Sequence, residues 1–136
     1  MEYCAGGSLR SRMRQQPAPL QTIMQWGKDL ADTLHFVHRQ GIVHHDIKPD
    51  NILFTSEEAL KIGDFGVANR NAGTVPYLAP EMLLGEVDTA DARVDVYALG
   101  ITLLELLRNR NPFDGMSPGE TQRAKMRHEF IPSELE

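Results

Sequence analysis

The most informative part of the sequence is HHDIKPDN at residues 44–51, which lies in a loop between two short apolar segments. Thirteen positions past Asn51, the sequence DFG at residues 64–66 again follows directly after an apolar segment. Two aspartates and one asparagine on adjacent strand-to-loop turns can converge on one point, because the hairpin between them is tight. Carboxylate and amide oxygens of this kind suit Mg²⁺, which accepts a few protein oxygens and leaves room for phosphate and water.

The residues before this loop predict one strand end and two helices. Residues 1–8 are expected to be a strand end that runs into a glycine-rich turn. Ser8 is placed to cap a short helix that continues to Arg14. Residues 20–40 carry apolar side chains at three- and four-residue spacing, which predicts a long amphipathic helix. Gly41 then supplies the left-handed stop.

The middle of the chain predicts three short strands, at residues 42–43, 52–54 and 60–62. The polar residues 55–59 are expected to form a hairpin loop between the last two strands. Residues 63–80 are rich in Gly, Asn and Pro and predict a loop.

Two helices are expected in the last third of the chain. Residues 91–107 are apolar on most faces, which predicts a central buried helix, and residues 117–130 predict a more exposed one. The fold class is therefore mainly α with a small β component.

Composition narrows the function classes. The chain has 136 residues, 41% hydrophobic and 24% charged, which is ordinary for a globular domain. A net charge of −5 gives no electrostatic reason to expect nucleic acid or a membrane as partner. The most apolar run, residues 96–107, is too short to span a bilayer. The single cysteine, Cys4, cannot form an internal disulfide, so a cytoplasmic location is expected.

The loop and the DFG sequence resemble the catalytic loop and the metal-binding motif of protein kinases. The resemblance implies that Asp46 accepts the proton of the substrate hydroxyl. It implies that Asn51 and Asp64 hold Mg²⁺ against the phosphates of ATP. Lys48 would place a positive charge on the transferring phosphate. The Lys-Pro pair at 48–49 is similar to serine/threonine kinases more than to tyrosine kinases.

Further segments agree with this resemblance in order and spacing. Residues 73–81, GTVPYLAPE, resemble the segment on which a protein substrate docks, with Thr74 near the catalytic aspartate and Glu81 at its end. Asp95 matches the aspartate of the buried helix that braces the catalytic loop. His44 is expected to be a structural residue that stacks under Phe65.

The resemblance also assigns an adenine pocket and a domain organisation. Glu2 and Cys4 would lie in the hinge at residues 1–8, where backbone groups hydrogen-bond adenine, and Leu53 would form the pocket floor. Residues 9–136 would form a helical C-terminal lobe, with an activation segment at 64–81. The kinase domain is thus expected to be partial, incomplete at both ends, with an apolar cleft that a missing N-terminal lobe or a partner would cover.

Three alternatives remain beside the expected ATP- and Mg²⁺-dependent protein serine/threonine kinase. One is a pseudokinase or truncated kinase that binds proteins without catalysis. Another is a small-molecule kinase of the same fold, although the docking segment at 73–81 argues against it. The third is a zinc site at His44 and His45, although adjacent histidines in an extended segment point to opposite faces.

Two departures from the family pattern concern regulation. His45 stands where most regulated members have arginine, and only twelve residues, 67–78, separate the DFG and APE sequences. We therefore expect that phosphorylation of the loop does not regulate this protein. The arginines at 10, 12 and 14 are expected to form a solvated helix face, with a substrate or partner contact as the alternative.

Overall fold

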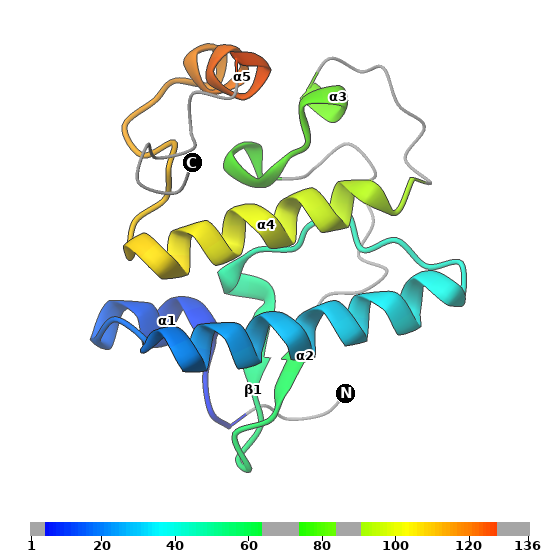
Figure 1. Ribbon diagram of the computed structural model, residues 1–136, viewed down its shortest axis with the longest axis vertical. Coiled ribbons are helices and arrows are strands. Elements are labelled where there is room, and N and C mark those ends of the chain that lie inside the picture. Colours follow the sequence, from blue (N-terminus) through cyan, green and yellow to red (C-terminus); the bar gives the residue numbers. More distant parts are fainter. Residues whose placement is uncertain (1–4, 64–73, 84–90, 128–136) are drawn as a thin grey trace.

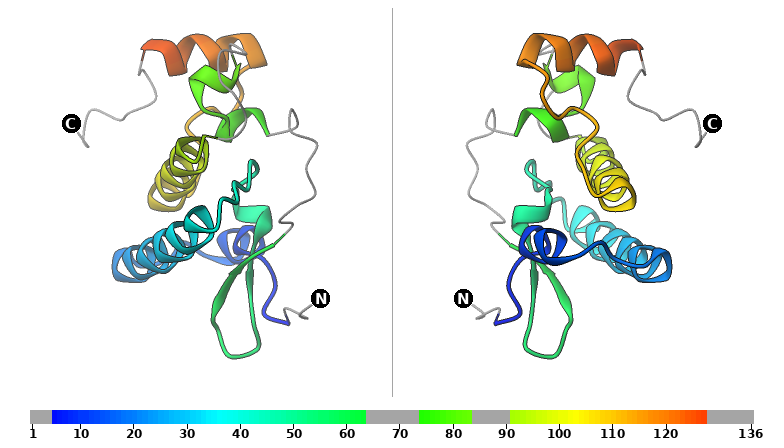
Figure 2. Two further views of the ribbon diagram at one scale, coloured as in Figure 1. Left: turned by 90° about the vertical axis from the view of Figure 1, so that its right-hand side faces the viewer. Right: turned by 90° about the vertical axis from the view of Figure 1, so that its left-hand side faces the viewer.

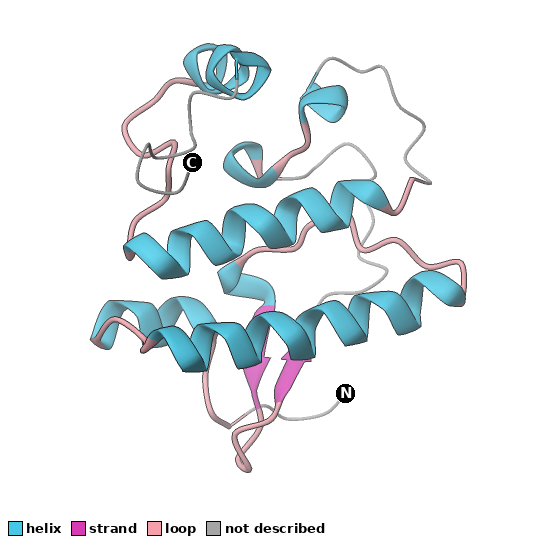
Figure 3. Cartoon of the chain, in the orientation of Figure 1, coloured by secondary structure: helices cyan, strands magenta, loops and turns pink. Residues whose placement is uncertain are grey.

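The computed structural model describes residues 5–63, 74–83 and 91–127. Four predicted site residues lie outside these ranges, namely Glu2, Cys4, Asp64 and Phe65. Helices dominate the described chain, and a single small sheet lies at one end (Figure 3). The elements in chain order are α1 (Leu9–Gln15), α2 (Leu20–Arg39), the 3₁₀ turn η1 (Pro49–Asn51), β1 (Ile52–Phe54), β2 (Leu60–Ile62), the 3₁₀ turn η2 (Val75–Tyr77), α3 (Pro80–Leu83), α4 (Arg93–Arg108) and α5 (Pro118–Arg127).

The helices form layers, with α4 in the middle (Figure 1). On one side α4 packs against α2, and on the other side it faces η2, which also contacts α5. The side views show the hairpin at one end of the molecule and α5 at the other (Figure 2). Loop 44–51 runs between the part of the molecule that contains the hairpin and the part that contains α5, so both parts hold the loop.

The predicted helix ends at Ser8 and Gly41 are confirmed. Ser8 accepts a hydrogen bond from the backbone N–H of Ser11 at 3.1 Å, which satisfies one of the free donors of the first turn. Gly41 has φ of +80°, and its N–H bonds to the carbonyl of His38 at 3.0 Å. The next N–H, of Ile42, reaches back to the carbonyl of Val37, which completes a Schellman stop.

The two predicted strands at 52–54 and 60–62 pair as an antiparallel hairpin, with Leu53 opposite Lys61. The turn between them is closed by Thr55, whose hydroxyl accepts the N–H of Ala59 at 3.1 Å. The expected strand at residues 42–43 is wrong, because these residues are loop. A strand requires a neighbour for its backbone groups, and within the described residues no strand pairs with this segment.

The hydrophobic core includes Ile23, Leu30 and Leu34 of α2 and Ile101 of α4, and it extends to α1, β1, η2 and α5. Helices α2 and α4 approach closely at Gly27, where a Cβ atom would lie 3.3 Å from Leu103 Cδ2. The central position of α4 is as expected, although one face is solvated.

The predicted C-terminal helix is confirmed as more exposed than α4, since only Thr121, Ala124 and Lys125 of α5 are buried. The predicted loop at 63–80 needs adjustment, because its described part, residues 63 and 74–80, contains η2 and the first residue of α3. Within residues 5–63, 74–83 and 91–127, no helix has the length and apolar content to cross a bilayer.

Candidate active site

Loop 44–51 is fixed to α4 through the carboxylate of Asp95, which is fully buried. One oxygen accepts the backbone N–H of His44 at 2.8 Å, and the other accepts that of His45 at 2.9 Å. The ring of His38, from α2, contacts the same carboxylate at 2.8 Å. His45 has φ of +74°, a left-handed conformation that costs free energy outside glycine, so these bonds hold the loop in a strained shape.

His44 uses both of its ring nitrogens inside the protein. Nε2 lies 2.6 Å from the carbonyl of Gly63, and Nδ1 accepts the backbone N–H of Asp46 at 3.0 Å. A ring that donates from Nε2 and accepts at Nδ1 is the neutral Nε2–H tautomer. These contacts tie loop 44–51 to the end of β2. They also leave His44 without a nitrogen for zinc.

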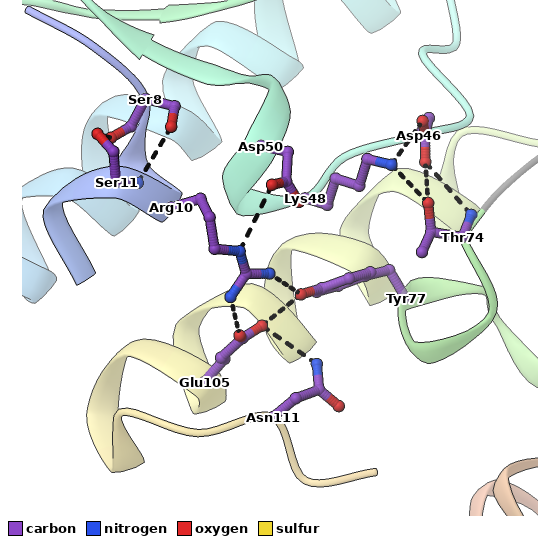
Figure 4. Close-up of polar contacts among 10 residues, drawn as sticks. All are labelled: Ser8, Arg10, Ser11, Asp46, Lys48, Asp50, Thr74, Tyr77, Glu105 and Asn111. Carbon is purple, nitrogen blue, oxygen red and sulfur yellow. Dashed lines mark hydrogen bonds and ion pairs between the residues drawn. The ribbon is translucent and has the colours of Figure 1, made fainter. Parts of the chain in front are cut away.

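Asp46, Lys48 and Thr74 come together on one side of the loop (Figure 4). The Thr74 hydroxyl donates to Asp46 Oδ1 at 3.2 Å and accepts from Lys48 Nζ at 2.6 Å. The backbone N–H of Thr74 also bonds to Asp46 Oδ1, at 3.3 Å. Lys48 Nζ lies 3.5 Å from Asp46 Oδ2. The structure thus places a hydroxyl between a carboxylate and an ammonium group.

Asn51 lies behind Asp46 and is buried. Its side-chain nitrogen donates to the backbone carbonyl of Asp46 at 2.8 Å and to Asp46 Oδ2 at 3.3 Å. The side-chain amide is therefore oriented, and its oxygen is the atom available to a cation. Leu53 follows in β1 and packs beside Gly63, where a Cβ atom would lie 3.1 Å from Leu53 Cδ1.

A second polar cluster, which the sequence analysis missed, links α1 to α4 and to η2 (Figure 4). Glu105 is 3% exposed and accepts from the guanidinium of Arg10, the hydroxyl of Tyr77 and the amide of Asn111. Arg10 also donates to the Tyr77 hydroxyl at 2.7 Å and lies 3.5 Å from Asp50. Burial raises the pKa of Tyr77 above its ordinary value, and the hydrogen bond to Glu105 adds to this shift.

The expected solvated face of arginines is therefore wrong for two of its three members. Arg10 is held inside the second cluster, and the guanidinium of Arg12 stacks 3.6 Å from the centre of the Phe54 ring and pairs with Glu58. Only Arg14 is exposed. The signal that could have found this cluster is Glu105 itself, because a charged residue within an apolar helical run requires a buried partner.

A cavity of about 660 Å³ opens beside these two clusters. Its walls come from α1, loop 44–51, residues 74–77 and the segment after α4, and they include Asp50, Thr74, Tyr77 and Asp114. The cavity therefore borders both Thr74 and the residues of the second cluster. Glu81, the other residue expected in substrate docking, lies in the first turn of α3 and is half-buried.

Comparison with known proteins gives a consistent result. The family model described as protein kinase domain matches residues 1–134. The chain is 38% identical over 145 residues to the serine/threonine-protein kinase PknB of Mycobacterium leprae, covering 97% of this chain and 23% of that protein. A probable serine/threonine-protein kinase of Clostridium acetobutylicum is 35% identical over 130 residues, which is 87% of this chain and 20% of the relative. The mitogen-activated protein kinase kinase kinase dlk-1 of Caenorhabditis briggsae is 36% identical over 124 residues, which is 83% of this chain and 14% of the relative.

The chain thus spans a quarter or less of the length of these curated relatives. The family model, by contrast, covers almost the whole chain and includes both polar clusters. The protein therefore belongs to the protein kinase domain family, of the serine/threonine type.

Proposed function

We propose that this chain carries the catalytic loop and the protein-docking segment of a kinase that transfers phosphate from ATP to serine or threonine hydroxyls of proteins. The observation that carries the proposal is the hydroxyl of Thr74, held between Asp46 and Lys48 at 3.2 and 2.6 Å. A substrate hydroxyl that enters this place would meet the same two groups.

Asp46 is the residue that we assign to proton transfer. A general base must lie within about 2.6–3.2 Å of the oxygen whose proton it takes, and the contact to Thr74 satisfies this condition. Lys48 would hold its positive charge beside the same oxygen, where negative charge accumulates during transfer. Asp95 would act on both residues indirectly, because it fixes the backbone of the loop that carries them.

The donor set of the site fits a magnesium ion. The nitrogen of Asn51 is used by Asp46, so the amide oxygen remains as a hard ligand of the kind Mg²⁺ prefers. Asp64, outside the described residues, is proposed as the second ligand, and Glu2, Cys4 and Leu53 as the adenine contacts. A bound Mg²⁺ would neutralise charge on the phosphates of ATP.

The test is transfer of labelled phosphate from Mg·ATP to a protein acceptor such as casein, catalysed by the full-length gene product. Asp46→Asn should lower the rate about 10²- to 10⁴-fold, which is the usual contribution of a general base. The matched control is Asp32→Asn on α2, whose side chain is 69% exposed and pairs with Lys28. This control should keep the wild-type rate.

The result that overturns the proposal is a wild-type rate equal to that of Asp46→Asn. If the same protein then binds other proteins without transfer of phosphate, the alternative of a non-catalytic protein-binding module takes its place.

A further inference from the structure

Lys125, in the last part of α5, makes an unusual set of contacts. Its side chain is fully buried, yet its ammonium group donates to three backbone carbonyls. These are the carbonyls of Val75 at 2.8 Å, of Pro76 at 3.0 Å and of Leu78. All three belong to one short segment, residues 75–78, which is 47 to 50 positions away in the sequence.

The amine has no carboxylate partner within the described residues. Its remaining neighbours are two aromatic faces, with Nζ 5.1 Å from the ring centre of Tyr97 and 4.9 Å from that of Phe113. Burial accordingly lowers the pKa of Lys125 to about 7. A buried lysine of this kind costs free energy, so a purely stabilising role would be served better by an apolar side chain.

The number and direction of the contacts suggest what the amine does instead. An ammonium group has three N–H donors, and here each one meets a different carbonyl of residues 75–78. The same segment is closed internally by the bond from Tyr77 N–H to the carbonyl of Thr74 at 2.9 Å. Lys125 thus fixes the backbone that begins at Thr74, from the side opposite the catalytic loop.

Thr74 is the point where this segment meets the candidate active site. Its hydroxyl and its N–H both bond to Asp46, so a shift of residues 75–78 would move the groups that Asp46 and Lys48 contact. We propose that Lys125 is a positioning residue for phosphoryl transfer, which holds residues 75–78 in the shape that presents a protein substrate to Asp46. The proposal rests on the proposed kinase function and adds to it a residue in a different helix.

The test compares Lys125→Met, which keeps the length and the contacts to the rings, with Lys125→Gln, which keeps two N–H donors without charge. In the full-length gene product, Lys125→Met should lower kcat/KM for the protein acceptor about 10- to 100-fold. Lys125→Gln should lie between Lys125→Met and the wild type. The dissociation constant of Mg·ATP should stay within about twofold in both variants.

Two further measurements separate positioning from a structural role. Hydrogen exchange at the backbone N–H of Tyr77 and Leu78 should become faster in Lys125→Met, while the amides of α2 keep their wild-type rates. Lys28→Met, at an exposed lysine on α2, is the control that should change neither exchange nor activity.

Several outcomes would overturn the inference. One is an unchanged kcat/KM in both variants. Another is a loss of Mg·ATP binding, acceptor turnover and amide protection together, which would show a general structural role. If Lys125→Met does not fold, a folded Lys125→Gln with wild-type turnover overturns the inference equally. A failure of the kinase proposal itself is recognised separately, because the wild type would then show no transfer dependent on Asp46.

Discussion

The change Glu105→Gln tests the buried cluster between α1, η2 and α4. Glu105 is 3% exposed, and its main partner is the guanidinium of Arg10, whose side chain is 22% exposed. The substitution keeps the size and one oxygen, but it removes the charge that compensates Arg10. It also places the NH₂ group of the new amide, which donates, opposite a hydrogen-bond donor of Tyr77 or Asn111.

The magnitude follows from the burial of the two partners. Removing one member of a buried ion pair costs roughly 3–5 kcal/mol. Arg10 retains some contact with water and with Asp50 at 3.5 Å, so we expect a smaller cost than for a fully buried pair, about 2–4 kcal/mol in the free energy of unfolding. For a chain of 136 residues, this corresponds to a decrease in Tm of about 7–14 °C.

The assay is equilibrium unfolding in urea together with calorimetry of the chain. The double variant Arg10→Met with Glu105→Leu should recover much of the loss, because well-packed apolar groups replace a buried pair at little cost. Glu57→Gln, at an exposed carboxylate in the hairpin turn, is the control and should change Tm by less than about 2 °C. A loss below about 1 kcal/mol for Glu105→Gln would contradict a buried charge pair at this place. So would a double variant whose loss equals the sum of the losses of Arg10→Met alone and Glu105→Leu alone.

Three other changes test separate features. Asp95→Asn should cost about 2–4 kcal/mol in urea unfolding, because an N–H₂ group would oppose a backbone N–H of loop 44–51; an unchanged midpoint would contradict this. Gly41→Ala should lower the free energy of unfolding by about 1 kcal/mol, because alanine is strained at a φ of +80° although no atom lies close to its Cβ. Gly100→Ala in α4 is the control, since Gly100 has equally open space and no positive φ. As the pH rises above about 7, the folded chain progressively releases one proton of the Lys125 ammonium group, whose pKa is about 7, whereas the unfolded chain keeps this proton to about pH 10. The free energy of unfolding should therefore rise between pH 7 and 9 by up to about 1.4 kcal/mol per unit, and a Lys125→Met variant with the same slope would disprove the assignment.

Several local features of the fold could be predicted from the sequence. The cap at Ser8, the stop at Gly41 and the hairpin between β1 and β2 are formed by backbone groups a few residues apart, so their signals lie within a short window. The strand expected at residues 42–43 failed for the opposite reason. Apolar β-branched residues favour an extended chain, but a strand also needs a partner, which a local window does not contain.

The candidate site also contains features that are local in the sequence and features that are not. The order and spacing of Asp46, Lys48 and Asn51 were readable because these residues share one loop. Two sets of contacts could not be predicted from the sequence. They join Arg10 to Glu105, 95 positions away, and Lys125 to residues 75–78.

The family pattern, the long helices and the candidate residues of the site could therefore be predicted from the sequence alone. Which charges are buried, and which groups they contact, depends on the tertiary structure, because packing brings the partners of a buried charge together from distant helices. Loop 44–51 depends on both. Its residues are adjacent in the sequence, but its shape depends on Asp95 in α4, and its contact with Thr74 depends on the packing of η2.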